Sequence, residues 1–338
     1  MGDSITPRFG NMKALLGIVA GAGASYGLYK LISSSSFRKS RKGTRNDSSN
    51  VSTVSLQPGS LLAKVSGLDV VSARPVTSKT VDVASAGNLE PKHLKTLLSC
   101  LQFSNSQDDK CRMLLTLANA SAFVINQNLI REYEGIPIIA GFLSDPAADV
   151  RVQSLIALNN LSMNIENQEQ LTVYVPKVLE LIETSPMNSE LQLCALRLLT
   201  NLSVTDKHQH LLKDSIKLLL SLFVVSNETL QVQTLKVLVN LSSNPDMMDD
   251  IVQVQAPASV LLLFDPRTVP AVLVRLLTFA GNLKAWRPSA QVAAELRQNQ
   301  DSLFRLMLDE SSQLHSRVLP LLSHPEEEVR LQAARVLT

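Results

Sequence analysis

Aromatic side chains and cysteines are scarce in this 338-residue chain. Only 4% of the residues are aromatic although 45% are hydrophobic, so the apolar content is mainly aliphatic, which favours helices. The odd number of cysteines argues against a secreted domain built on disulfides and fits a reducing compartment. Because no neighbouring motif would activate a thiol, we expect Cys100, Cys111 and Cys194 to be small buried apolar residues.

The motifs of the common enzyme classes are also missing. The sequence contains no G-x-S-x-G motif, and the glycine-rich stretch 21–27 is not followed by the GK[ST] of a phosphate-binding loop. His208 and His210 lie close together, but no acidic or thiol ligand accompanies them at the spacing of a metal site. The sequence therefore predicts a protein that is not an enzyme and that binds no cofactor, metal or small-molecule substrate.

Charge is distributed unevenly along the chain. Residues 1–45 carry eight Lys or Arg and one Asp, which leaves 24 basic and 29 acidic residues for the remainder. The larger part is thus mildly acidic, and the basic residues cluster only near the start. This balance disfavours nucleic-acid binding.

An apolar segment near the start predicts a membrane anchor at residues 12–32, after a short tail at 1–11. Sixteen uncharged residues separate Lys13 from Lys30, and as a helix they would measure roughly 24 Å, slightly less than the ~30 Å hydrocarbon core. The two lysines can extend along the helix towards the interfaces, so the segment can span. The residues expected to contact lipid are Leu15, Leu16, Ile18, Val19, Tyr26, Leu28 and Tyr29.

The basic residues after this segment predict its orientation and its membrane. They are Arg38, Lys39, Arg41, Lys42 and Arg45. Such a cluster places the C-terminal side in the cytosol, and it disfavours a cleaved secretory signal. Short, weakly apolar anchors with basic flanks are typical of the mitochondrial outer membrane, and the endoplasmic reticulum is the alternative. The Ser-rich residues 33–87 predict a disordered linker.

From residue 88 onwards the pattern becomes helical and repeats. An asparagine recurs at intervals of 41, 41, 39 and 42 residues, at Asn119, Asn160, Asn201, Asn240 and Asn282. Apolar residues occupy the positions five and two before it and one after it, which together form one stripe on a helix. A period near 40 is that of armadillo or HEAT repeats. Residues 88–338 are thus predicted to be all-α, an armadillo-like right-handed helical solenoid.

A second match supports the repeat without using the asparagines. The stretch "SDPAADVRVQSLIAL" from Ser144 aligns with "SHPEEEVRLQAARVL" from Ser323 at a constant offset of 179 residues. Val150, Arg151 and Gln153 find identical residues at this offset. The interval before the last repeat holds about sixteen extra residues, so that repeat is predicted to be irregular.

Two roles are open for the recurring asparagines. Each lies beside the apolar stripe, so its amide could point into a groove and hold an extended peptide backbone. Alternatively, the amides could tie each helix to its neighbour. One residue can serve both purposes.

Several stretches resemble a known family. "INQNLIREYEGIPIIA", "ALNNLSMNIENQ", "TNLSVTDKHQHLL" and "VNLSSNPDMM" are similar to the armadillo-like domain of the X-linked armadillo-repeat proteins and their autosomal relative, and "GAGASYGLYKLI" resembles their anchor. The resemblance implies a mitochondrial outer-membrane protein that faces the cytosol and regulates mitochondrial distribution and dynamics. It implies Miro GTPases and Trak kinesin adaptors as partners. The alternative that it implies is a regulator of cell growth and survival that binds a transcription factor, at the endoplasmic reticulum or in the nucleus.

One departure from importin-type armadillo proteins bears on the partner. Those proteins carry Trp four residues before the groove asparagine, whereas the residues here are Leu115, Ile156, Arg197, Lys236 and Thr278. This chain therefore lacks the Trp side chains on which the lysine stems of basic peptides stack. We expect Arg197 and Lys236 to form a weakly basic patch that prefers acidic or carbonyl-rich segments; the alternative is that both are solvated surface cations.

Overall fold

The computed structural model describes residues 90–299 and 301–338, which form α-helices and 3-10 helices. The β-structure of these residues is one isolated antiparallel bridge, between Gln255 and Ser302. None of their helices has the length and apolar character needed to cross a bilayer. The predicted tail, anchor and linker, and the basic cluster at 38–45, lie outside the described residues.

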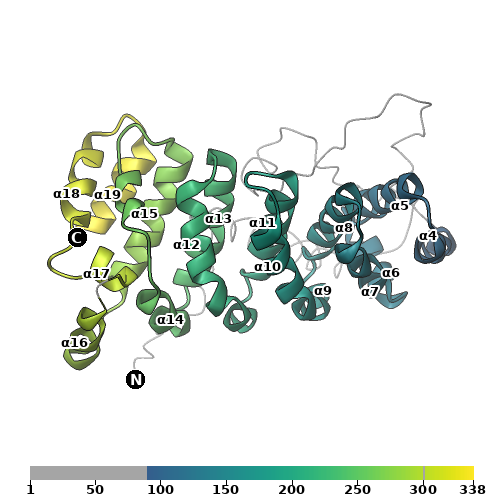
Figure 1. Cartoon of the computed structure of the whole chain (residues 1–338), viewed down its shortest axis with the longest axis horizontal. Coiled ribbons are helices and arrows are strands. Elements are labelled where there is room, and N and C mark those ends of the chain that lie inside the picture. Colours follow the sequence, from purple (N-terminus) through teal and green to yellow (C-terminus); the bar gives the residue numbers. More distant parts are fainter. Residues whose placement is uncertain (1–89, 300) are drawn as a thin grey trace, which may run out of the picture. The chain divides into compact units, whose positions relative to one another are not determined.

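Six long helices, here called the ladder helices, follow one another along the domain, and each packs against the next. Figure 1 shows them in chain order from the α5 end to the α19 end. They are α5 (Gln107–Ala120), α8 (Ala148–Leu161), α11 (Glu190–Leu202), α13 (Glu228–Ser242), α15 (Pro270–Ala285) and α19 (Glu327–Leu337). The first five carry the predicted asparagines, so the repeat register is confirmed.

The sequence explains why these helices form and pack. Side-chain oxygens of Ser106, Ser189 and Asn227 accept hydrogen bonds from the first-turn amides of α5, α11 and α13, which satisfies donors that have no partner within the helix. The leucines five residues before the asparagines are all 0% exposed in the five helices. Full burial of one such side chain contributes roughly 1.5–3 kcal/mol, so the apolar stripe drives the stacking.

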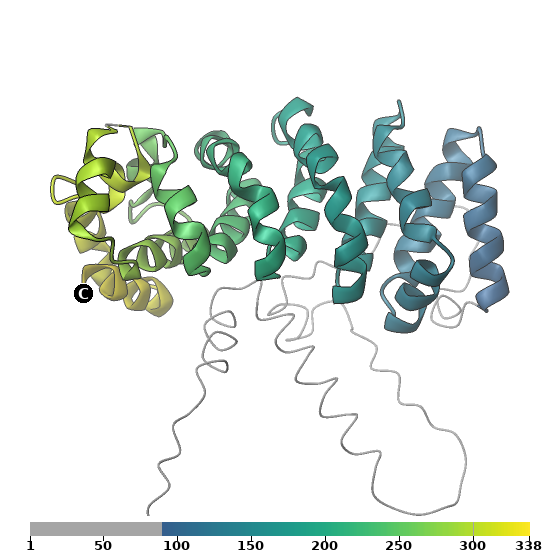
Figure 2. The same cartoon turned by 90° about the horizontal axis from the view of Figure 1, so that it is seen from below.

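Shorter helices connect the ladder helices and cover one side of them. Helices α7, α10 and α12 pack on α8, α11 and α13, and η7 packs on α19. The view in Figure 2 shows these units following each other along the long axis. Helix α4 (Pro91–Phe103) precedes α5. The connecting helices are α6 (Val124–Glu132), α7 (Gly135–Gly141), η2 (Phe142–Ser144), α9 (Ile165–Leu171), η3 (Thr172–Tyr174), α10 (Val175–Thr184), η4 (Asp206–Ser215), α12 (Ile216–Val225), η5 (Pro245–Met247), α14 (Met248–Gln253), η6 (Ala258–Leu263), α18 (Leu314–Val318) and η7 (Leu319–Ser323).

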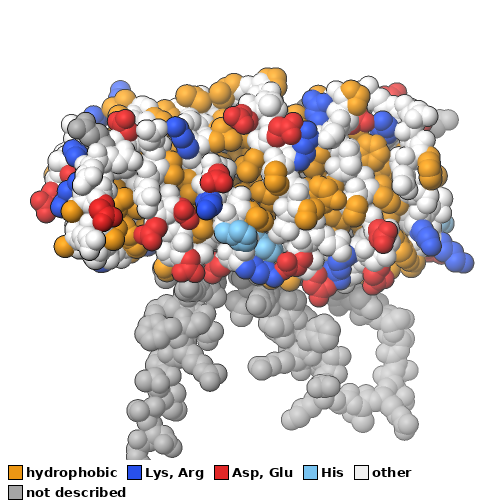
Figure 3. Space-filling model, turned by 60° about the horizontal axis from the view of Figure 1, so that its bottom comes forward, with side chains coloured by type: hydrophobic (Ala, Val, Ile, Leu, Met, Phe, Trp, Pro, Cys, Tyr) orange, Lys and Arg blue, Asp and Glu red, His pale blue; other side chains and the backbone are white. Residues whose placement is uncertain are grey.

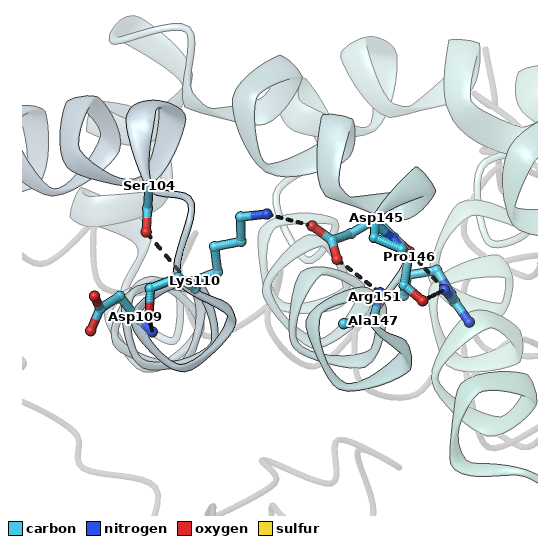
Figure 4. Close-up of polar contacts among 8 residues, drawn as sticks. Ser104, Asp109, Lys110, Asp145, Pro146, Ala147 and Arg151 are labelled. Carbon is cyan, nitrogen blue, oxygen red and sulfur yellow. Dashed lines mark hydrogen bonds and ion pairs between the residues drawn. The ribbon is translucent and has the colours of Figure 1, made fainter.

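The turn before α8 is held by charged side chains, as Figure 4 shows. Nζ of Lys110 on α5 donates to Asp145 at 2.8 Å, and the amide of Ala147 donates to the other oxygen of that carboxylate at 2.9 Å. Burial opposes ionisation of Asp145, but these hydrogen bonds outweigh it and hold the pKa of the carboxyl below its usual value. The charged turn fixes where α8 starts and joins it to α5.

The same turn recurs before α19, as the 179-residue match predicts. Nη1 of Arg151 donates to the backbone oxygens of Asp145 and Pro146 at 2.6 and 2.9 Å. In the last repeat, Nη1 of Arg330 donates to the oxygens of His324 and Pro325 at 2.7 and 2.8 Å. The repeated spacing of proline and arginine thus encodes one local structure twice.

The predicted irregular repeat contains an added helix. Residues Ala290–Gln298 form α16 and Leu303–Met307 form α17. The segment is joined to the preceding repeat by backbone hydrogen bonds from Ala256 to Asp301 at 2.9 Å and from Leu303 to Val254 at 2.8 Å. Because α15 and α19 still pack directly on each other, the insertion leaves the ladder continuous.

The cysteines correct one expectation. Cys194 is buried as expected and Cys111 is half-buried, but Cys100 is exposed. Helix α4 buries Leu94, Leu98 and Leu101, and Cys100 follows Leu98 by two residues, which places it about 200° around the helix. It therefore lies on the solvent side. Burial raises the pKa of the Cys194 thiol to about 12.

Candidate protein-binding surface

Three motif asparagines donate from their amides to equivalent backbone oxygens of the preceding ladder helix. Nδ2 of Asn160 donates to the oxygen of Ala118 at 2.8 Å. Nδ2 of Asn201 donates to Asn159 at 3.2 Å, and Nδ2 of Asn240 donates to Thr200 at 3.3 Å. Each acceptor lies in the last turn of its helix, where carbonyl groups lack partners within the helix. The amides therefore tie neighbouring repeats together.

In three repeats, the serine two residues after the asparagine accepts a hydrogen bond from the asparagine of the next repeat. Oγ of Ser162 accepts from Asn201 at 2.9 Å, and Oγ of Ser203 accepts from Asn240 at 2.9 Å. Oγ of Ser242 accepts from Asn282 at 3.0 Å in the next repeat. This contact explains the recurrence of Asn-Leu-Ser in α8, α11 and α13, because the serine of each accepts from the asparagine of the following ladder helix.

Asn119 differs from the other four motif asparagines because α5 is the first ladder helix among the described residues. The side chain of Asn119 is exposed. Asn160, Asn201 and Asn282 are half-buried and Asn240 is buried. The geometry thus gives four of the five asparagines a structural role between helices. Their use in holding a peptide backbone stays a prediction.

A second ladder is formed by glutamines eight residues after the asparagines. Nε2 of Gln168 donates to the oxygen of Ser162 at 2.8 Å in its own repeat and to Asn201 at 3.3 Å in the next repeat. Gln127 and Gln209 make the same pair of contacts in their repeats. These glutamines, here called the glutamine braces, are at most 4% exposed. They satisfy buried helix-end carbonyl groups and join consecutive repeats.

Two of the braces also accept a hydrogen bond from the following repeat. Oε1 of Gln168 accepts from Thr205 at 2.6 Å, and Oε1 of Gln209 accepts from Asn244 at 2.9 Å. The side-chain amide of these braces is therefore used at both its oxygen and its nitrogen. In the sequence, this ladder is visible as a glutamine directly after Asn126, Asn167 and His208. The sequence alone does not indicate which groups these glutamines contact.

His208 stands where the two preceding repeats have Asn126 and Asn167, and it interrupts the pattern of their contacts. Asn126 and Asn167 donate to the oxygens of Ala120 and Leu161 at 3.0 and 3.1 Å. The ring nitrogens of His208 are buried without a hydrogen bond, and Nε2 lies 3.5 Å from Oε1 of Glu169. Burial, with the charge of Lys207, lowers the pKa of His208. The described residues hold no cluster of three or more His, Cys, Asp or Glu that could bind a metal.

The predicted basic patch lies on α11 and α13. Arg197 is half-buried, and Lys236 is only 7% exposed. Both side chains take part in further interactions, so neither resembles a freely solvated cation. The preference of this patch for acidic segments stays a prediction.

The surface offers no large area of one charge on the face seen in Figure 3. Basic and acidic side chains are interspersed there, and hydrophobic side chains lie between them. Some of the exposed apolar residues occupy equivalent sites, because Val124 and Ile165 each open the helix after a ladder helix and are 39% and 40% exposed. A mixed surface of this kind is suited to protein partners.

Stacked units of about 40 residues, with polar ladders between them, define a helical-repeat solenoid, a class of protein that binds other proteins along an extended surface. A family model described as armadillo-like matches residues 89–308. The chain belongs to this armadillo-like family, and the predicted all-α repeat fold is confirmed.

Solved structures of designed proteins have the same fold. A designed armadillo repeat protein in complex with the peptide (KR)4 is 16% identical, with a TM-score of 0.59, and the match covers 72% of this chain and 98% of that one. A computationally designed armadillo repeat protein for modular peptide recognition gives 16% identity and a TM-score of 0.61, with the same shares covered. An engineered protein is 18% identical, with a TM-score of 0.59 and 72% and 94% covered. At these identities the likeness concerns the fold alone.

Proposed function

We propose that this protein is a non-enzymatic adaptor that is anchored in the mitochondrial outer membrane and binds protein partners through its armadillo-like domain in the cytosol. The observation that supports the protein-binding part of this proposal is the continuous row of six ladder helices, which presents one extended surface. Peptide recognition by an armadillo repeat array has a precedent in the designed neighbour made for modular peptide recognition. Within the family, we place the chain in the X-linked group, beside its autosomal member.

The sequence supplies the membrane part of this proposal. Residues 12–32 are the proposed anchor, and the basic residues at 38–45 favour a cytosolic domain. Residues 33–87 would give the domain a long reach from the membrane. By resemblance, the proposed partners are Miro GTPases and Trak kinesin adaptors, and the proposed role is control of mitochondrial distribution and dynamics.

Localisation tests the anchor. The full chain should colocalise with a mitochondrial outer-membrane marker, whereas a chain that lacks residues 1–32 should be released. A matched variant keeps the segment but replaces Arg38, Lys39, Arg41, Lys42 and Arg45 with Gln, and should shift towards the endoplasmic reticulum. A truncated chain that stays on mitochondria would contradict the anchor, and one that accumulates in the nucleus would favour the growth-regulator alternative.

Partner capture tests the surface. Arg197→Glu combined with Lys236→Glu reverses the charge of the predicted patch and should reduce capture of Miro or Trak proteins by the full chain. Because Lys236 is buried, circular dichroism must first show that the fold survives. Lys213→Glu combined with Lys217→Glu makes the same charge change on η4 and α12, outside the ladder helices, and should not alter capture. Equal loss in both pairs would contradict a specific site.

A further inference from the structure

Arg335 near the end of α19 is held against the preceding ladder helix. Its Nη2 donates to Oδ1 of Asn282 at 2.8 Å, and Nδ2 of Asn282 in turn donates to Ser242. A chain of hydrogen bonds therefore runs across α13, α15 and α19. This network fixes one edge of the guanidinium and leaves its other N–H groups without an acceptor among the described residues.

A glycine makes room for this side chain. A Cβ atom placed on Gly281 would lie 3.3 Å from Nε and 3.4 Å from Cζ of Arg335, which is tighter than ordinary van der Waals contact. The positions equivalent to Gly281 in the four preceding ladder helices are Ala118, Asn159, Thr200 and Val239. The absence of a side chain at Gly281 thus matches the contact that Arg335 makes between α15 and α19.

The guanidinium is partly buried and its charge is not balanced. Burial alone lowers the pKa of Arg335, with no opposing contribution from a carboxylate. No ion pair of Arg335 occurs within residues 90–299 and 301–338, although other cations of the domain, such as Lys110 and Arg297, have carboxylate partners. A half-buried arginine with unused donors favours an anion that is supplied from outside.

The neighbouring surface has the same sign. At the 179-residue offset, Arg335 aligns with Ile156. Arg335 therefore occupies the repeat position four residues before the motif asparagine, which Arg197 and Lys236 occupy in their own repeats. Each motif asparagine shares one helix face with the residues four and seven positions before it. Across the six ladder helices these positions include cations but no Asp or Glu. At these positions an acidic segment would meet no like charge; the acidic residues of the same face, such as Asp149, lie one turn closer to the helix start.

We propose that Arg335, positioned by Asn282 and Gly281, binds a side-chain carboxylate of an acidic, extended peptide segment in a partner protein. The inference rests on the proposed function, because it assumes that the ladder-helix surface binds protein segments. The planar guanidinium suits a carboxylate that accepts two parallel hydrogen bonds. Asp or Glu side chains farther along the segment would lie over the row that contains Arg197 and Lys236.

Fluorescence anisotropy on the full chain tests this site with a labelled peptide of alternating Glu and Ser, at low and at high salt. Arg335→Gln should raise the Kd roughly tenfold at low salt and should reduce its salt dependence. Arg335→Lys keeps the charge but loses the planar fork, so its effect should be smaller. Gly281→Ala should also weaken binding, because the added Cβ displaces the guanidinium while the charge remains.

The control is Arg267→Gln, which removes an equal charge from a side chain that is 90% exposed and paired with Asp265, and it should leave the Kd unchanged. Peptides with Gln or with alternating Lys and Arg in place of Glu should not bind. Failure of the Glu peptide to bind, equal losses in Arg335→Gln and Arg267→Gln, or binding only of a phosphoserine peptide would each overturn the proposal. If Arg335→Gln does not fold, Arg335→Lys and Gly281→Ala decide the matter.

The outcome separates this inference from the proposed function. Loss of Miro or Trak capture in the Arg197 and Lys236 variant, together with unchanged peptide binding in Arg335→Gln, would remove the Arg335 site and keep the adaptor surface. Binding that depends on Arg335, without any capture of those partners, would support the acidic-segment site and contradict the assigned partners.

Discussion

Replacing the brace Gln168 with Ala should weaken the junction between two repeats. Gln168 is 2% exposed, and it is the side-chain partner of Ser162, Asn201 and Thr205. The oxygen of Asn201 keeps a backbone donor, the amide of Val204, at 3.4 Å. The oxygen of Ser162 has no other donor among the described residues, so it would be left unpaired.

The magnitude follows from these partners. An unpaired buried carbonyl costs about 1–3 kcal/mol, and loss of the acceptor for the half-buried Thr205 hydroxyl costs about 0.5–1 kcal/mol. Gln168→Ala should therefore lower the free energy of unfolding by about 1.5–4 kcal/mol. Gln102→Ala on α4 makes the same chemical change at an exposed site and should change it by less than about 0.5 kcal/mol.

Urea unfolding followed by circular dichroism measures this effect on the full chain. Because Gln168 joins two repeats, its loss should also broaden the transition, as expected when nearest-neighbour coupling in a repeat array weakens. A double-mutant cycle of Gln168→Ala with Thr205→Val should give a coupling energy of about 0.5–1.5 kcal/mol. A Gln168→Ala protein as stable as Gln102→Ala, or a cycle without coupling, would refute the brace.

Three further outcomes are expected. Burial holds the pKa of His208 below its ordinary value of about 6.5 in the folded chain, so the unfolded chain takes up the proton first and stability falls as pH drops below about 6.5. In pH-dependent melts, His208→Asn should remove this loss, whereas His210→Asn should leave most of it, because burial is the largest cause of the lowered pKa. Arg151→Ala should lower the free energy of unfolding by about 1–3 kcal/mol in urea, because two carbonyl groups before α8 lose a charged donor. Burial raises the pKa of the Cys194 thiol, so a thiol reagent should label the exposed Cys100 in the native chain and Cys194 only after unfolding. Rapid native labelling of Cys194 would contradict its burial.

The repeat architecture could be predicted from sequence because its determinants are local and periodic. The leucine stripe beside Asn160 and Asn201 specifies a helical face, and the recurring proline and arginine around Pro146 and Arg151 specify a turn. Both signals fall within one repeat. Their spacing alone therefore indicates the order of the helices.

The polar ladders could not be assigned in the same way. The acceptors of Gln168 and Asn240 are backbone oxygens at helix ends, partly in another repeat, and a backbone oxygen has no sequence signature. Arg335 was missed because its partner, Asn282, is 53 residues away and an added helix lies between them. Its alignment with Ile156 was a usable signal, since it placed Arg335 in the row that contains Arg197.

Site-specific photo-crosslinking in cells tests most directly whether partners bind the ladder-helix surface. A photoreactive residue at Ile156 lies on a ladder helix, and one at Val225 lies at the end of α12, where the native side chain is 60% exposed. We predict protein adducts of the full chain from position 156 and none from position 225. Adducts from position 225 with none from position 156 would contradict the binding surface described above.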